Sequence, residues 1–385
     1  MNNRIQTIDV FRAITMFLMI FVNDFWTLTG IPTWLEHAKA DQDFLGFSDI
    51  IFPTFLFIVG MSVPYAIKNR ISKGDSPLKM FIHIVFRSVA LLVMGLFTVN
   101  ISNLNVQASG FSREAFQIIM VVAFFLIWNV YPKAEDWKKY LFMGLKGLGI
   151  VILLTLFFVF KGGKEGLQPM TPQWWGILGL IGWTYLITAS IYLFVYKSPW
   201  ILVGFWVLFS LLNIADHAHW LKTPIPGGGA FQGLSFAGIL ASLLLDYFNK
   251  AEKRHILPLV YAGTGLLLFA AGLGLHQFFI ISKILATPTW IYLCNAIAFG
   301  LLAVLFWIVD MKKKESWFAV IKPAGTSTLT CYLVPYVYYS LAVYAFSLPV
   351  FLKTGAIGLL KSAAYAFIVV FITALLGRLS IKLKI

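Results

Sequence analysis

The first hydrophobic segment and the loop after it hold most of the polar residues that could do chemistry. His37 lies in this loop, and imidazole is the side chain best suited to moving protons near neutral pH. Asp49 opens the next hydrophobic segment, where a carboxylate can cap a helix or orient a neighbouring imidazole. Because a loop histidine is often simply solvated, the pattern alone leaves both a catalytic and a solvated His37 open.

Three further polar residues flank this histidine. Asn23 and Asp24 lie near the far end of the first hydrophobic segment, where a polar side chain in a membrane is costly unless it bonds to something. Lys39 follows His37 by two positions. These three residues are the candidates for binding a substrate.

Basic residues also occur inside or beside the hydrophobic segments. Arg12 is three positions after Asp9, so the two can pair on one helix face as a structural ion pair. Arg87 lies deeper, so it either snorkels to the membrane interface or binds a phosphate of a cytoplasmic ligand. The candidates for phosphate binding are Arg12, Lys68, Arg87 and Lys283.

The composition predicts the elements that position these residues. Of 385 residues, 59% are hydrophobic and 12% charged, and the mean hydropathy of +0.83 excludes an ordinary soluble domain. A bilayer core needs about 20 apolar residues per helix, and such stretches recur along the chain. We predict one all-α polytopic transmembrane domain over residues 1–385, with spans near 8–30, 49–67, 80–99, 113–131, 139–160, 174–196, 199–215, 230–248, 256–275, 288–309, 323–346 and 355–377.

The connections between these spans differ in charge. Lysine and arginine gather in every second connection, at 68–79, 132–139, 249–255 and 312–322, and again after 378. The positive-inside rule therefore predicts that both termini are cytoplasmic. The pair of spans in 174–215 is the least certain, and omitting it would leave ten spans with the same orientation. Arg4 precedes the first span without a cleavage signal, so we expect a retained helix.

Several functional classes are not favoured. Cys294 and Cys331 both lie in apolar segments, which indicates buried thiols and not a disulfide scaffold. The net charge of +14 is scattered between spans, so nucleic acid is not an expected partner. We see no metal-ligand pattern and predict no metal. The glycine-rich loop 225–233 lacks the lysine of a phosphate-binding loop.

The N-terminal motifs resemble those of the transmembrane acyltransferase family of heparan-α-glucosaminide N-acetyltransferase and its bacterial DUF5009-type relatives. The similarity is carried by D-x-F-R-x-I from Asp9, F-V-N ending at Asn23, H-A at His37, and S-D-I-I-F-P-x-F-L-F-I-x-G from Ser48 to Gly60. Fainter similarity continues at Arg87, Lys283 and Trp290, and in P-A-G-x-S-x-L from Pro323. The segment R-E-A-F-Q at 113–117 and the extra pair of spans depart from the family pattern.

The resemblance implies that His37 is catalytic, with Asp49 at the histidine and Asn23 at the acceptor. It implies an acetyl group moved from cytoplasmic acetyl-CoA to a glucosamine-like amino sugar on the periplasmic side of a bacterial inner membrane. Whether the histidine is transiently acetylated or acts as a base stays open. An amino-sugar permease using the same cavity is the alternative, and a transferase acting on a hydroxyl of an envelope glycan is a third possibility. The expected partners are the amino sugar and membrane lipid, with a homodimer possible.

Overall fold

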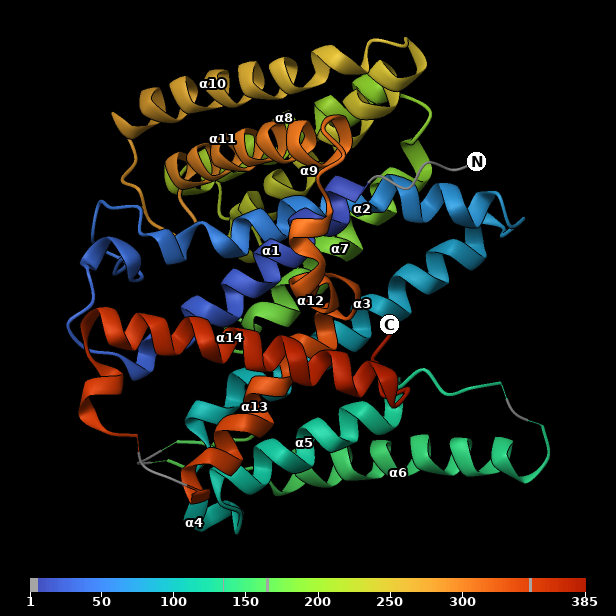
Figure 1. Ribbon diagram of the computed structural model, residues 1–385, viewed down its shortest axis with the longest axis vertical. Coiled ribbons are helices and arrows are strands. Elements are labelled where there is room, and N and C mark those ends of the chain that lie inside the picture. The colour runs from blue at the N-terminus through green and yellow to red at the C-terminus, as the bar shows by residue number, and fades with distance from the viewer. Residues whose placement is uncertain (1–5, 134, 164–165, 346–347) are drawn as a thin grey trace.

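A computed structural model describes residues 6–133, 135–163, 166–345 and 348–385. Arg4 and residue 346 of the predicted 323–346 span therefore lie outside the described residues. The described chain folds as an all-α polytopic membrane bundle (Figure 1). Its long helices are α1 (Gln6–Asn23), α2 (Ile51–Ile71), α3 (Pro77–Asn100), α5 (Arg113–Trp128), α6 (Trp137–Val159), α7 (Gly176–Val195), α8 (Pro199–His217), α9 (Ala230–Lys250), α10 (Leu257–His276), α11 (Pro288–Leu305), α13 (Thr328–Ala345) and α14 (Gly355–Arg378).

Each long helix coincides with one of the spans predicted from the sequence. Among the described residues, 9 helices are long and apolar enough to cross a membrane, and both α7 and α8 are in that group. The helices α1, α5 and α13 occupy the other three predicted spans. The segment 174–215 thus contributes two ordinary long helices, and α7 packs closely along α3.

Two predicted spans differ from the observed helices. The first span is predicted to reach residue 30, but α1 ends at Asn23 and a short 3-10 turn follows at Phe25–Thr27. Gly30 and Pro32, which favour turns, lie just beyond it, so the chain does not return to an α-helix there. The span at 323–346 is interrupted at Ser327, which separates the short helix α12 (Lys322–Thr326) from α13. Here the Thr328 hydroxyl donates to the carbonyl of Gly325, competing with helical hydrogen bonding.

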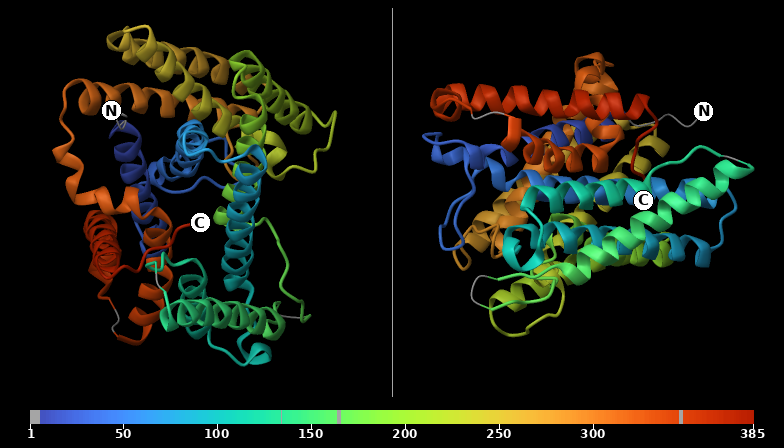
Figure 2. Two further views of the ribbon diagram at one scale, coloured as in Figure 1. Left: turned by 90° about the vertical axis from the view of Figure 1, so that its right-hand side faces the viewer. Right: turned by 90° about the horizontal axis from the view of Figure 1, so that it is seen from below.

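The bundle has two distinct ends. We call the end that carries the loop 24–50 and the connection 277–287 the His37 face; both lie at the left in Figure 1. The opposite end, with the connections 72–76 and 251–256, residues 129–133 and the segment 379–385, is called the lysine-rich face. Figure 2 shows the helices running between these ends around a central region that α1, α2 and α3 border.

Close backbone contact between α2 and α9 holds the centre of the bundle. A Cβ atom on Gly60 would lie 1.9 Å from the carbonyl oxygen of Ser235, and one on Gly238 would lie 1.9 Å from that of Phe57. Only glycine fits at such contacts, and small residues are the usual means by which membrane helices approach each other. The glycine that ends the Ser48–Gly60 motif is therefore explained by packing.

Candidate functional site

His37 and Asp49 form a hydrogen-bonded pair on the His37 face. The Nδ1 atom of His37 lies 2.7 Å from Oδ1 of Asp49. The side chain of His37 is 46% exposed and that of Asp49 is 1% exposed, so the carboxylate is buried beneath a ring that reaches the surface. The structure thus brings together the two residues that the sequence suggested as a catalytic pair.

Backbone groups hold the carboxylate of Asp49 in place. Its second oxygen, Oδ2, accepts hydrogen bonds from the backbone N–H of Ala38 at 3.0 Å and of Gly46 at 3.2 Å. The indole of Trp290, fully buried on α11, donates to the backbone carbonyl of Asp49 at 3.2 Å. The two backbone N–H donors and the His37 ring fix the orientation of the buried carboxylate, and the Trp290 indole fixes the backbone of the same residue.

The loop between His37 and Asp49 folds back on itself at a glycine. A Cβ atom on Gly46 would lie 2.0 Å from the carbonyl oxygen of Glu36, so the loop closes only with glycine at this position. The Ser48 hydroxyl donates to the carbonyl of Leu35 at 2.6 Å and closes the loop on its other side. These contacts set the distance between the imidazole and the carboxylate.

A third ionisable residue reaches the pair from a distant part of the chain. The Nζ atom of Lys283 lies 3.1 Å from Nδ1 of His37 and 3.8 Å from Oδ1 of Asp49. Its loop is tied to the His37 loop by the Ser282 hydroxyl, which donates to the carbonyl of Ala40. Asp43 adds a second link, since its carboxylate accepts from the backbone N–H of Ile281 and contacts His276.

The contact with Asp49 favours one tautomer of the neutral His37 ring. With the carboxylate as the acceptor, Nδ1 carries the proton and Nε2 keeps its lone pair, and the Lys283 amine, 3.1 Å from the same Nδ1, does not donate to it in this tautomer. Burial lowers the pKa of the Lys283 amine below its ordinary value, although the charge of Asp49 opposes this effect. The arrangement can therefore supply a nitrogen base or nucleophile at the surface, with a lysine beside it.

The other expected substrate residues on this face differ in their surroundings. Asn23 and Lys39 are exposed. Asp24 is 2% exposed, and both its oxygens are taken: the Tyr339 hydroxyl donates to one, and the Lys361 amine and the Ser362 hydroxyl, at 2.5 and 2.6 Å, donate to the other. Asp24 therefore anchors the end of α1 to α13 and α14.

A cavity of about 410 Å³ lies between α1, α2, α3, α7 and the α12–α13 break. Both Arg12 and Arg87 line it, whereas no acidic side chain does among the described residues. Arg12 bonds to Asp9 at 3.2 Å and to the Ser62 hydroxyl at 2.8 Å, which confirms the expected ion pair. Arg87 stacks 4.5 Å from the ring centroid of Tyr185, and its Nε is buried without a hydrogen-bond partner.

The cavity reaches far along the bundle. On α2 its lining runs from Ala66 to Phe55, about 16 Å at a rise of 1.5 Å per residue. Phe55 is six residues from Asp49, a further ~9 Å toward the His37 face. His37 itself is not part of the cavity lining.

Two of the expected phosphate-binding residues lie outside this cavity, and one unexpected residue lines it. Lys283 belongs to the His37 face, and Lys68 is an exposed residue 3.9 Å from Asp246. Lys384 lines the cavity because the segment 381–385 pairs with residues 128–130 and buries Leu383. The sequence offered no signal for this role, because a lysine after the last span is normally interpreted as a sign that the C-terminus is cytoplasmic.

Comparison with known proteins places these residues in a family. The chain is 34% identical over 99 residues to the heparan-alpha-glucosaminide N-acetyltransferase of Mus musculus, and 33% identical over 98 residues to that of Homo sapiens. These matches cover 26% and 25% of this chain but only 14% of each relative, so the chain spans a small part of their length. The model of the family described as a domain of unknown function, DUF5009, matches residues 4–223, more than half of the sequence, and the chain therefore belongs to the DUF5009 family.

Proposed function

We propose that this multi-pass membrane protein is an acetyltransferase that uses acetyl-CoA bound from the cytoplasm to acetylate an amino sugar on the periplasmic side of a bacterial inner membrane. The observation that carries the proposal is the pairing of His37 with the buried Asp49, which leaves Nε2 of the imidazole free at the surface. The partial similarity to two N-acetyltransferases supports the same reaction class.

The cavity on the other side of the bundle supports a phosphorylated donor. Coenzyme A carries a diphosphate and a 3′-phosphate, and Arg12, Arg87 and Lys384 provide three basic groups in the described lining, of which Arg12 is paired with Asp9. The length of this cavity along α2 suits an extended pantetheine arm, with its thioester directed toward Asp49 and His37. The donor thus stays on the lysine-rich face, and only the acetyl group crosses.

The chemistry follows from the free lone pair on Nε2 of His37. In a direct transfer, Nε2 takes a proton from the acceptor amine while the amine nitrogen attacks the thioester carbonyl; the C–S bond breaks and the thiolate leaves. In a two-step transfer, Nε2 bonds to the acetyl carbon as the C–S bond breaks and the thiolate leaves. The amine nitrogen then attacks the acetyl carbon, the bond to Nε2 breaks, and the amine proton passes to the released imidazole. Asp49 stabilises the imidazolium-like charge in both routes.

The sidedness rests on the charge of the connections. The basic connections lie on the lysine-rich face, which by the positive-inside rule faces the cytoplasm together with both termini. The acceptor would then meet His37, Asn23 and Lys39 on the periplasmic side. Lys283 beside His37 is placed to contact the acceptor or to influence the protonation of its amine.

The test is acetyl transfer by the full chain in proteoliposomes. With labelled acetyl-CoA on the lysine-rich side and glucosamine on the other, wild type should form N-acetylglucosamine, identified by mass. His37→Ala should reduce turnover at least ~100-fold while thermal unfolding is unchanged. His255→Ala, an exposed histidine on the lysine-rich face, is the matched control and should retain full activity.

The same vesicles separate the alternatives. Uptake of the sugar in the absence of acetyl-CoA, without a change in its mass, would identify a permease and contradict the proposal. Undiminished transfer by His37→Ala would remove the histidine from the mechanism. Acid-quenched protein that carries an acetyl group on His37 would select the two-step route.

A further inference from the structure

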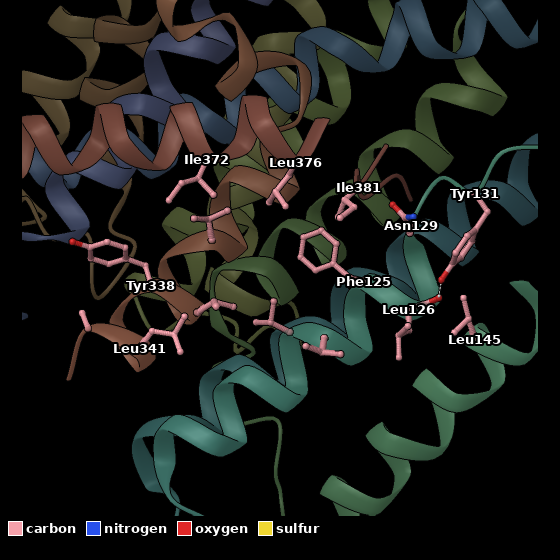
Figure 3. A pocket seen from close by; sticks show the side chains of 15 residues that line it. Phe125, Leu126, Asn129, Tyr131, Leu145, Tyr338, Leu341, Ile372, Leu376 and Ile381 are labelled. Atoms are coloured by element: carbon pink, nitrogen blue, oxygen red, sulfur yellow. Dashed lines mark hydrogen bonds between the residues drawn. The ribbon is translucent and has the colours of Figure 1, made fainter. Parts of the chain in front are cut away.

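An apolar groove separates the α5–α6 hairpin from α13 and α14. The groove has a volume of about 710 Å³. Figure 3 shows Phe125 and Leu126 of α5, Leu145 of α6 and Ile372 and Leu376 of α14 around it. Its walls are almost entirely hydrocarbon, so it is not a place for acid–base chemistry.

The position of the groove indicates what fills it. The helix α6 packs mainly against α5 and buries few of its residues, so the hairpin stands at the edge of the bundle, where lipid surrounds it. An empty apolar groove forfeits dispersion contacts along its whole length, whereas a hydrocarbon chain restores them. The volume lies in the range of ~300–1,000 Å³ that is common for ligand pockets.

An independent observation at one end of the groove concerns Lys146. This lysine lies on the exposed side of α6, nine residues and therefore about 13 Å into the helix from Trp137, next to the groove residue Leu145. Its Nζ lies 5.7 Å from the ring centroid of Tyr131, and no ion pair of Lys146 with an acidic side chain is found within the described residues. A cation at this depth among apolar side chains is costly unless an anion accompanies it.

The two observations meet at the end of the groove where Asn129 and Tyr131 lie (Figure 3). We propose that the groove binds an anionic phospholipid, with one acyl chain between the α5–α6 hairpin and α13–α14 and the phosphate at Lys146. Lys146 reaches toward the lysine-rich face, so the lipid belongs to the leaflet on that side. The lipid would hold the hairpin against the bundle.

The experiment uses the full chain in nanodiscs of equal parts phosphatidylglycerol and phosphatidylethanolamine, followed by native mass spectrometry. Wild type should retain phosphatidylglycerol about fivefold in excess, as expected for one lysine beside a headgroup of net negative charge, whereas phosphatidylethanolamine is zwitterionic. Lys146→Gln should abolish this preference without changing the number of bound lipids. Val122→Trp, which projects into the groove from an exposed position, should reduce the number of lipids bound.

A second lysine on α6 provides the control. Lys139→Gln on the same helix, outside the groove lining, should keep the wild-type preference, and unchanged thermal unfolding shows that the variants fold. An unaltered preference in Lys146→Gln means that the lysine merely snorkels to water, and the proposal fails. A dimer that Val122→Trp dissociates would show that a second copy fills the groove, which also overturns it.

Discussion

Asp49 holds His37 through a single hydrogen bond of 2.7 Å, and its other oxygen is occupied by two backbone N–H groups. One oxygen thus serves the His37 ring, and the other serves both backbone N–H groups. The same buried carboxylate therefore holds the loop that carries His37 and keeps the ring proton on Nδ1. A substitution that preserves the shape of Asp49 but not its two equivalent oxygens tests this dependence directly.

Asp49→Asn should invert the tautomer of His37. The amide oxygen is needed by the N–H groups of Ala38 and Gly46, so the amide N–H₂ must face Nδ1 and donate to it. The proton of the ring then moves to Nε2 and blocks the base. We expect kcat to fall about 100-fold with little change in KM. Nitrogen-15 NMR of the imidazole reports the tautomer, and an unchanged tautomer would contradict the assignment.

Lys283 should make folding stability increase with pH in alkaline buffer. Its pKa in the folded protein is lowered from 10.5, so below that pH the unfolded chain binds more protons than the folded chain. The free energy of unfolding therefore rises as the pH rises toward 10.5. Thermal unfolding of Lys283→Met should lack this rise, whereas Lys39→Met, an exposed lysine of the His37 loop, should keep it.

Arg87→Met and Lys384→Met should weaken donor binding. Each removes one cation from the cavity, and a hydrogen bond to a charged group contributes about 1.5–3 kcal/mol, so KM for acetyl-CoA should rise at least ~10-fold. An acetyl-pantetheine donor, which lacks the adenosine phosphates, should show no such difference between Lys384→Met and wild type. Lys68→Met is the control, because Lys68 lies outside the cavity. Equal losses with both donors would argue for a packing defect.

Gly60→Ala should destabilise the bundle at the contact between α2 and α9. The added methyl group meets the Ser235 carbonyl oxygen, which belongs to rigid backbone and cannot move aside as a side chain can. Overpacking of this kind costs about 1–3 kcal/mol or more, and the thermal midpoint should fall. Gly144→Ala on α6 is the matched control, since nothing lies within 4 Å of its added Cβ. Similar midpoints for both variants would show that α2 and α9 can separate.

The sequence was sufficient for the helices and for the central pair of the candidate site. Spans are set by local apolar runs, so each long helix could be predicted, with errors where α1 gives way to a 3-10 turn after Asn23 and where Ser327 interrupts a run. His37 and Asp49 are close in sequence and share one loop, so their pairing could be anticipated.

Contacts between distant segments could not be predicted in the same way. Lys283 joins His37 only because two loops, 246 positions apart, are tied by hydrogen bonds. Asp24 is predicted to bind a substrate; in the fold, Lys361 and Tyr339 from the far end of the chain bond to its oxygens, and all three residues line a cavity of about 510 Å³. Lys384 reaches the cavity through a short backbone pairing with 128–130 that has no signature in side-chain type.

The interruption at Ser327 has a consequence for solvent. Gly325, Thr326 and Thr328 place irregular backbone and hydroxyl groups in the wall of the arginine-lined cavity. Arg12, Arg87 and Lys384 line the same cavity, and charged side chains inside a membrane are stable where water reaches them, so we expect water to the depth of the interruption. In the proposed reaction, a thioester bound in this hydrated cavity can hydrolyse before it meets the acceptor. Efficient transfer therefore favours an ordered sequence of events, in which the acceptor is seated before the acyl group arrives.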